Sequence, residues 1–397
     1  MFARRTDWPL EPNALTREVE LRRARGLPLI DLAESNPTRC GFVYDSASIL
    51  RALSKPAALE YVPDPRGPRE ARRAVAAYYE ERGARVDPES LFLTASTSEA
   101  YSYLFRLLAD SGDSVLAPQP SYPLFEFLAG LSDLEVIPYP LTYGSQWHID
   151  LDGLATCVQH TRRELGAPRA IIAVHPNNPT GSFVEAEESA KLAEICCRHR
   201  LAIIADEVFS DYVFGSQSRF THAASERVLT FTLSGLSKIA ALPQMKLAWI
   251  VVSGPEDARR QAVERLEIIA DTYLSVSTPV ASAAPELLGT RRSLQPQLMA
   301  RLRRNLAQVD RSLESSRGVA NRLHVEGGWY SILKLGVDSG ISDDDLATTL
   351  ARDDGVVVHP GHFYGFQRDG HLVVSLLPKP ETFAKGIAKL VARLRRL

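Results

Sequence analysis

The chain contains little cysteine and carries almost no net charge. Four cysteines in 397 residues are too few for a disulfide framework, and the adjacent Cys196 and Cys197 cannot face each other on a helix. A formal net charge of -2 leaves no basic surface of the kind that binds nucleic acid. No uninterrupted apolar stretch is long enough to cross a bilayer, and the first residues lack the apolar core of a signal peptide. These absences predict a soluble, cytoplasmic protein without nucleic-acid or membrane partners.

What the chain does contain is a regular alternation of apolar runs and helical segments. With 397 residues and 45% hydrophobic content, it can bury a sizeable core in about two domains. Strands that alternate with helices predict an α/β fold whose large, mainly parallel mixed sheet is flanked by helices. We expect helices over 68–79 and 187–198, and strands over 91–94, 115–118, 170–174, 201–205, 228–233 and 247–252.

The pattern changes after residue 255, where longer helical segments lead into a second set of short apolar runs. This change predicts a smaller α/β domain in addition to the large one. The expected parts are an N-terminal segment that joins the small domain (1–50), a large domain (51–275) and a small C-terminal domain (276–397).

One lysine stands between two apolar runs that are expected to be buried strands. Lys238 follows the run 228–233 and precedes the run 247–252. Burying an ammonium group costs several kcal/mol unless its charge is paired or its pKa falls. A lysine placed in this way can act as a nucleophile, although taken alone the segment is also compatible with a solvated loop lysine.

Polar side chains follow five of the predicted strands, and ligands of parallel sheets bind beyond the carboxyl ends of the strands. Each residue also has an ordinary structural explanation, such as a helix cap, a turn or a packed aromatic ring. Their convergence at one edge of the sheet favours a binding site. The residues concerned are Ser96, Tyr122, Asn178, Asp206 and Lys238.

Three short motifs occur in a characteristic order along the chain: Asn178-Pro179-Thr180-Gly181, Asp206-Glu207 and Ser237-Lys238. In this order and at about these spacings, they resemble the motifs of the pyridoxal-phosphate-dependent class I/II aminotransferases. The resemblance extends from about residue 29 to the C-terminus. It implies the aspartate-aminotransferase fold, also called fold type I, and pyridoxal 5'-phosphate (PLP) as the cofactor.

The resemblance implies a role for each matching residue. Lys238 resembles the lysine that forms a Schiff base with the cofactor and moves the proton of the substrate. Asp206 resembles the partner of the pyridinium nitrogen, which keeps the ring an electron sink. Asn178 resembles the donor to the phenolic oxygen of the ring, and Tyr122 resembles the aromatic residue that stacks on it.

Other matching residues concern the phosphate group. Ser96 and Thr97 match the helix start that binds it, since free N–H groups and the helix dipole favour an anion there. Lys246 stands where the family usually has an arginine, so the charge is kept but the bidentate fork is lost. Tyr61 resembles the tyrosine that reaches the cofactor phosphate of the neighbouring subunit, which implies a homodimer with shared active sites.

The chain departs from the family at three further positions. Phe209 replaces a tyrosine whose hydroxyl binds the phenolic oxygen, and Ser234 or Tyr212 is a candidate replacement for that hydroxyl. Gly235 stands where serine or threonine is frequent. Val373 stands where the family has the arginine that binds the substrate carboxylate, so the substrate class is open.

A valine cannot bind an anion, so the carboxylate of an amino-acid substrate needs another partner. Arg39 is the candidate, because it follows a segment that passes over the active site in this family and because a guanidinium group suits a carboxylate. A surface charge is an equally good interpretation of Arg39. Lys334 and His362 are alternative anchors.

The predicted function is amino-group transfer between an amino acid, or a related amine, and a 2-oxo acid. A PLP-dependent lyase that cleaves a β C–S bond would share Lys238, Asp206 and Asn178. Release of pyruvate and ammonia without a keto-acid acceptor would distinguish the lyase. A catalytically silent binding protein on the same fold is a third possibility, and it would fail to convert bound PLP to pyridoxamine phosphate.

Overall fold

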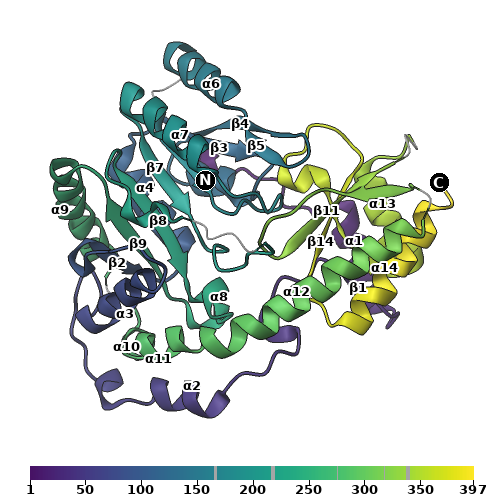
Figure 1. Cartoon of the computed structure of the whole chain (residues 1–397), viewed down its shortest axis with the longest axis horizontal. Helices are drawn as coiled ribbons and strands as arrows, with labels where there is room; N and C mark the ends of the chain where they lie inside the picture. Colours follow the sequence, from purple (N-terminus) through teal and green to yellow (C-terminus); the bar gives the residue numbers. More distant parts are fainter. Residues whose placement is uncertain (165–167, 216–219, 275, 317, 337–339) are drawn as a thin grey trace.

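An eight-stranded sheet forms the centre of the larger part of the molecule (Figure 1). The computed structural model describes residues 1–164, 168–215, 220–274, 276–316, 318–336 and 340–397. Neighbouring strands pair in parallel from β8 through β7, β6 and β3 to β4, whereas β9 and β5 run antiparallel to their neighbours. The order across the sheet is β2 (Leu91–Thr94), β9 (Ala248–Ser253), β8 (Thr230–Gly235), β7 (Ala202–Asp206), β6 (Pro168–Val174), β3 (Ser114–Gln119), β4 (Glu135–Tyr143) and β5 (Trp147–Ile149).

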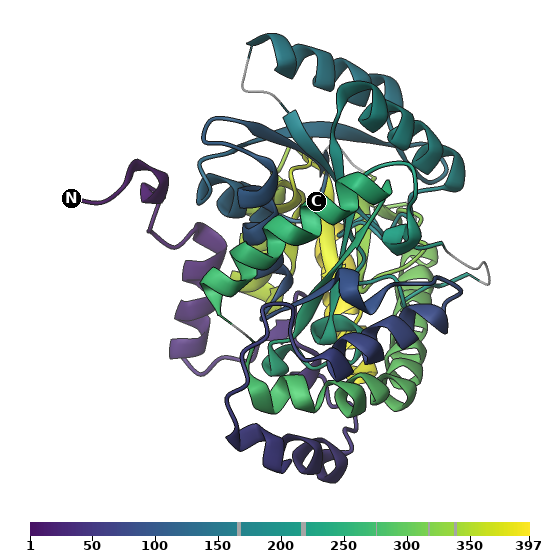
Figure 2. The same ribbon diagram turned by 90° about the vertical axis from the view of Figure 1, so that its left-hand side faces the viewer.

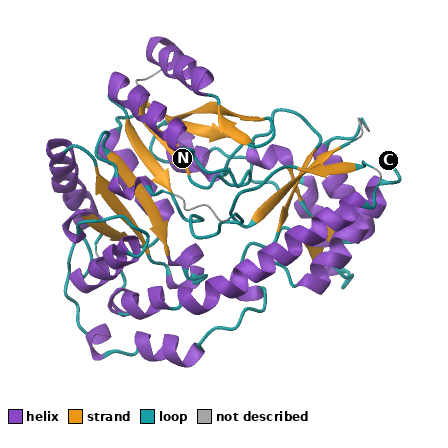
Figure 3. Ribbon diagram, viewed as in Figure 1, coloured by secondary structure: helices purple, strands orange, loops and turns teal. Residues whose placement is uncertain are grey.

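Helices cover both faces of this sheet, as Figure 3 shows. Successive side chains of a strand point to opposite faces, and β7 illustrates the consequence. Ile204 packs in one apolar cluster with α4, α5 and α9, whereas Ile203 packs on the other face with α6 and α7. The helices are α1 (Ala14–Ala24), α2 (Ser46–Leu53), α3 (Arg69–Glu80), α4 (Thr97–Leu108), α5 (Leu124–Gly130), α6 (Leu151–Glu164), α7 (Ala186–His199), α8 (Leu236–Ile239), α9 (Glu256–Tyr273), α10 (Thr278–Ser282), α11 (Ala284–Gly289), α12 (Arg291–Glu314), α13 (Asp343–Thr349) and α14 (Pro380–Leu394).

A smaller antiparallel sheet lies in the C-terminal part of the chain, with the order β10 (Ala320–Arg322), β11 (Tyr330–Leu335), β14 (His371–Ser375) and β13 (His359–Pro360). The long helix α12 extends from the large sheet toward this part and shares its apolar core with α14 (Figure 1). The N-terminal segment joins it through β1 (Ile30–Asp31), which pairs in parallel with β12 (Val356–Val357). The first residues extend away from the body of the molecule in Figure 2.

The predicted fold class is confirmed, and the six expected strands all form within one or two residues of their expected limits. The strands β4 and β5 and the helix α6 were not expected. The proposed end of the large domain falls on residue 275, which lies outside the described residues, and the division of the chain into domains stays a prediction. Among the described helices, none combines the length and the apolar character that crossing a membrane requires.

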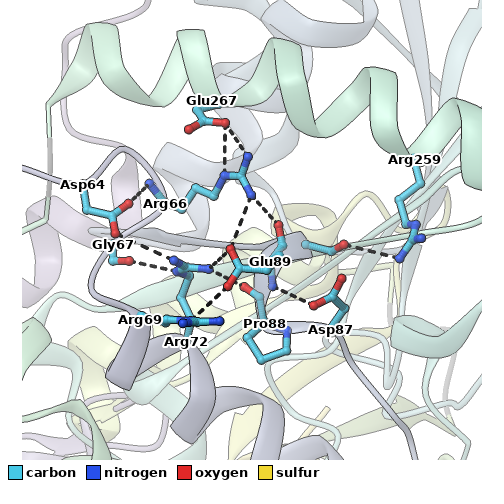
Figure 4. Close-up of polar contacts among 11 residues, drawn as sticks. Asp64, Arg66, Gly67, Arg69, Arg72, Asp87, Pro88, Glu89, Arg259 and Glu267 are labelled. Carbon is cyan, nitrogen blue, oxygen red and sulfur yellow. Dashed lines mark hydrogen bonds and ion pairs between the residues drawn. The ribbon is translucent and has the colours of Figure 1, made fainter.

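A network of charged side chains holds the segment 64–67 against the large sheet (Figure 4). Arg72, whose side chain is 6% exposed, donates to the backbone oxygens of Gly67 at 2.9 Å and Pro88 at 2.7 Å, and to Glu89 at 3.1 Å. Arg66 forms an ion pair with Glu267 of α9. Because the carbonyl groups of the buried Gly67 and the half-buried Pro88 have an arginine donor, the turn keeps its shape next to the strand β2.

Replacing Arg72 with alanine should lower the free energy of unfolding by about 1–3 kcal/mol, because the carbonyl group of the buried Gly67 loses a charged donor. Urea denaturation monitored by circular dichroism measures this. Arg69→Ala is the matched control: Arg69 lies on the same helix and binds the same Glu89, but its side chain is 63% exposed. Exposed pairs contribute about 0–1 kcal/mol, so equal losses in the two variants would contradict the role of Arg72.

Candidate active site

A cavity of about 320 Å³ lies at the carboxyl edge of the large sheet. The strands β2, β3, β6, β7 and β8 end at this edge because they point in the same direction. The segments that follow them supply most of the lining. The predicted site residues that the structure brings together here are Ser96, Thr97, Tyr122, Asn178, Asp206, Lys238 and Lys246.

The start of α4 forms one wall of the cavity. Ser96 caps the helix, because its side chain accepts the N–H of Glu99 at 3.1 Å, and Glu99 in turn accepts the N–H of Ala95 at 2.6 Å. The cap leaves the first-turn N–H groups of Thr97 and Ser98 at the cavity, where both residues contribute to the lining. A helix start of this kind suits an anion such as a phosphate group.

Asp206 ends β7 and is buried, with 7% of its surface exposed. Burial raises the pKa of its carboxyl group to about 6, while the N–H of Val208, the hydroxyl of Tyr101 and the charge of Lys238 act in the opposite direction. The carboxylate oxygens accept from Val208 N at 3.2 Å and from the Tyr101 hydroxyl at 3.1 Å. Each oxygen keeps a second acceptor position for a ligand.

Lys238 lies on the short helix α8, directly after β8. Its Nζ is 5.3 Å from the centre of the Phe209 ring and 4.9 Å from the centre of the Trp329 ring. Burial among these rings lowers the pKa of Lys238 to about 8, although the Asp206 charge opposes the shift. About a tenth of the amine is therefore unprotonated at pH 7, and this is the form that acts as a nucleophile or a base.

The cavity contains further features that fit a flat, phosphorylated cofactor. Asn178 lines the cavity, and its buried Oδ1 atom has no hydrogen-bond partner among the described residues. The donor that this amide can offer to an oxygen of a ligand is its Nδ2 group. Tyr122 presents an aromatic ring to the same space. With the carboxylate of Asp206 as an acceptor, the amine of Lys238 and the N–H groups at the start of α4, these residues match the polar groups that PLP needs.

The backbone around Gly235 explains one departure from the family pattern. A Cβ atom at this position would lie 2.9 Å from the Cα of Ala248 and 2.9 Å from the carbonyl oxygen of Leu247. Since backbone atoms cannot yield to such contacts, β8 and β9 approach too closely for serine or threonine here.

The two hydroxyl groups expected to replace the missing tyrosine hydroxyl have other partners. Tyr212 donates to the backbone oxygen of Lys238 at 2.6 Å, and Ser234 lies 3.5 Å from the backbone oxygen of Glu207. Phe209 itself is buried and lines the cavity. The structure therefore places a phenyl ring, without a hydroxyl, beside Lys238.

Some of the predicted residues lie outside the cavity. Tyr61 and Arg39 are exposed. Arg39 ends the short helix Pro37–Arg39, and Ser35, two residues before this helix, lines the cavity. Val373 is buried in β14 opposite Ile332 and His359. Their predicted roles stay predictions.

The alternative partners for the substrate carboxylate also lie outside the cavity. Lys334 is exposed, and His362 lies 3.1 Å from Asp344, in a smaller pocket that shares Tyr122 with the cavity.

Several residues at the site come from distant segments of the chain and were not predicted from the sequence. Ser35 and Tyr330, which are far apart in the chain, both line the cavity. Ser98, directly after the predicted Thr97, also lines it, and so does Ser237 of the Ser237-Lys238 motif, to which no role had been assigned. Tyr101 contacts Asp206 from the interior of α4, and no local pattern distinguishes it from an ordinary core tyrosine.

Comparisons with known proteins agree with this geometry. A family model described as aminotransferase class I and II matches residues 28–390. The chain is similar to glutamate-pyruvate aminotransferase AlaA of Haemophilus influenzae, with 25% identity over 389 residues that cover 96% of this chain and 93% of that protein. It is 27% identical to alanine aminotransferase of Mycobacterium bovis over 379 residues, 92% of this chain and 86% of that protein. The solved structure of alanine aminotransferase from Pyrococcus furiosus has the same fold, with a TM-score of 0.88, 20% identity and 100% coverage of both chains.

Proposed function

Because this chain belongs to the class I and II aminotransferase family and is a PLP-dependent aminotransferase, we propose that it transfers an amino group between an amino acid, or a related amine, and a 2-oxo acid. The observation that supports the site most directly is the presence of Lys238 and Asp206 in one cavity. The relatives named for alanine or glutamate–pyruvate transfer support an amino-acid donor.

The proposed cofactor contacts follow from the cavity lining. The start of α4 and Lys246 would hold the phosphate, Asp206 the ring nitrogen and Asn178 the phenolic oxygen. When bound, PLP supplies an electron sink that stabilises negative charge at the donor carbon. Tyr122 would cover the ring and keep water away from it.

Lys238 would hold the cofactor covalently and move the proton at the donor carbon. The low pKa of its amine, about 8, supports both tasks. The aromatic rings of Phe209 and Trp329 beside Nζ exclude water, so that a proton removed from the donor carbon is kept within the site.

A homodimer in the cytoplasm is part of the proposal. Apolar side chains are exposed along the segment that contains Tyr61, namely Leu50, Leu59, Tyr61 and Val62. Exposed apolar surface of this kind is typical of an interface. A partner subunit would cover it and would receive Tyr61 at its own cavity.

A half-reaction screen tests the proposal. Amino acids and related amines are added one at a time to the PLP form, and the absorbance of the cofactor is followed as it is converted to pyridoxamine phosphate. At least one donor should convert it stoichiometrically, and a 2-oxo acid should restore the starting spectrum. A protein that binds PLP but converts it with no donor would contradict the proposal.

Restoring a hydroxyl beside Lys238 should change the titration of the bound cofactor. The Phe209→Tyr variant would place a donor near the phenolic oxygen and stabilise its anionic form. The pH midpoint of the visible absorbance change should therefore fall by about one unit, the equivalent of one ordinary hydrogen bond. A spectrophotometric titration of both proteins measures this, and an unchanged or higher midpoint would mean that the hydroxyl does not reach the cofactor.

The predicted role of Arg39 can be separated from cofactor binding. If Arg39 binds the carboxylate of the donor, Arg39→Ala should raise KM at least about tenfold, because a charged hydrogen bond of about 1.5–3 kcal/mol is lost. The affinity for PLP should not change. Steady-state kinetics with the best donor of the screen gives the answer, and an unchanged KM would assign the carboxylate to another group.

A further inference from the structure

Tyr101 of α4 is buried, and its hydroxyl group has one hydrogen-bond partner among the described residues. It donates to Asp206 Oδ2 at 3.1 Å, and 2% of the residue is exposed. Its ring packs edge-on against Phe125, with the centroids 5.5 Å apart, and at a tilt against Phe105 at 5.8 Å. These contacts hold the ring in one position, so the hydroxyl is fixed with respect to β7.

The position of Tyr101 along α4 is significant. Residues four apart lie on one face of a helix, so Thr97 and Tyr101 face the same way. Thr97 lines the cavity, and Tyr101 reaches the carboxylate that lines it from β7. A single face of α4 therefore serves both the proposed phosphate position and, one turn later, the proposed ring-nitrogen position.

We propose that Tyr101 is a positioning residue for the cofactor: it orients the Asp206 carboxylate and keeps it ionised, so that it can pair with the protonated ring nitrogen. The inference rests on the proposed function and assigns a role to a residue outside the family motifs. With Val208 N–H on one oxygen and Tyr101 on the other, rotation of the carboxylate would break a hydrogen bond.

The ionisation of Asp206 depends on every group that faces it. Tyr101 faces it from α4, Tyr122 from the segment after β3 and Lys238 from α8, while Glu207 is its neighbour in the chain. Tyr101 and Lys238 favour the charged carboxylate, and burial disfavours it. Without the Tyr101 hydroxyl, the pKa of Asp206 should rise toward neutrality, and the carboxyl group should be protonated over a wider range of pH.

The Tyr101→Phe variant tests the proposal because it removes the hydroxyl and keeps the packed ring. The dissociation constant of PLP is measured by fluorescence titration from pH 5.5 to 9. Affinity falls on the acid side as Asp206 becomes protonated, and the variant should show this fall about one pH unit higher. With the pKa of Asp206 at about 6 in the wild type and about one unit higher in the variant, the affinity of the variant should be reduced roughly threefold at pH 6.5 and roughly eightfold at pH 5.5. At pH 9 the two proteins should agree within about twofold. Ionisations of the cofactor itself affect both proteins alike.

A control separates this effect from a general loss of stability. Tyr139→Phe removes another fully buried hydroxyl, which donates to the backbone oxygen of Ile172 at 2.9 Å, and should leave the pH profile of PLP binding unchanged. If the affinity of Tyr101→Phe for PLP falls at the same acidic pH as that of the wild type, the proposal is overturned. A loss of affinity that is equal at every pH would also overturn it. Wild-type protein that binds no PLP would overturn the proposed function as well, so the two failures are distinguishable.

Discussion

The Lys238→Ala protein should lose amino transfer almost completely while remaining folded. The lysine supplies both the covalent attachment and the group that moves the proton, and loss of a positioned acid–base group alone costs about 10²–10⁴-fold in rate. Borohydride reduction of the wild-type protein should attach PLP to Lys238, as peptide mass spectrometry can detect. In the variant, no peptide should carry the cofactor.

The second lysine of the cavity is the matched control for this result. Lys246→Ala should still be labelled at Lys238, but PLP should bind more weakly because a phosphate partner is lost. The rate of PLP attachment to wild-type protein should rise with pH around the pKa of Lys238, about 8, as the amine loses its proton. A reducible adduct on another residue of Lys238→Ala would refute the assignment.

The Asp206→Asn protein should bind PLP and lose most of its turnover. An amide cannot neutralise a protonated ring nitrogen, and the loss of a charge-assisted hydrogen bond costs about 1.5–3 kcal/mol. This corresponds to roughly 10–100-fold in rate before any electronic effect on the ring. Single-turnover conversion of bound cofactor by the best donor measures the change, and unchanged rates would exclude the proposed pairing.

Although the Asp206→Asn substitution should lower turnover, it should stabilise the folded state of the cofactor-free protein. Burial raises the pKa of Asp206 from 3.8 to about 6, so between these values the folded state binds more protons than the unfolded state. Stability is therefore lost as the pH rises from about 4 to 6, by up to about 3 kcal/mol. Asp206→Asn should remove this dependence, and without cofactor it should withstand more urea than the wild type at pH 7.

Several site residues could be predicted from the apolar runs and helix caps of the sequence. Runs such as 201–205 are continuously apolar because the strand is buried on both faces, and the polar residue that ends such a run lies at the edge of the sheet. For this reason Asp206, Asn178 and Lys238 could be predicted together at one edge. The helix start at Ser96 was also predictable, because a capping side chain and its partner are close in sequence.

The residues that sequence reasoning missed depend on contacts between distant segments. Tyr101 has the spacing of a core residue of α4, and only the packing of that helix on β7 brings its hydroxyl to Asp206. Ser35 and Tyr330 meet at the cavity although they are far apart in the chain. The close contact that excludes a side chain at Gly235 likewise comes from Ala248 on a neighbouring strand.

The sequence by itself determined the α/β class, the positions of the main strands along the chain and the identity of the charged residues at their ends, because burial periodicity and helix caps are local properties of the chain. Only the tertiary structure decided which hydroxyl groups reach those charges and which are already bonded elsewhere. It also set the pKa values of Asp206 and Lys238, because desolvation and charge pairing depend on the distances between elements that the sequence pattern does not encode.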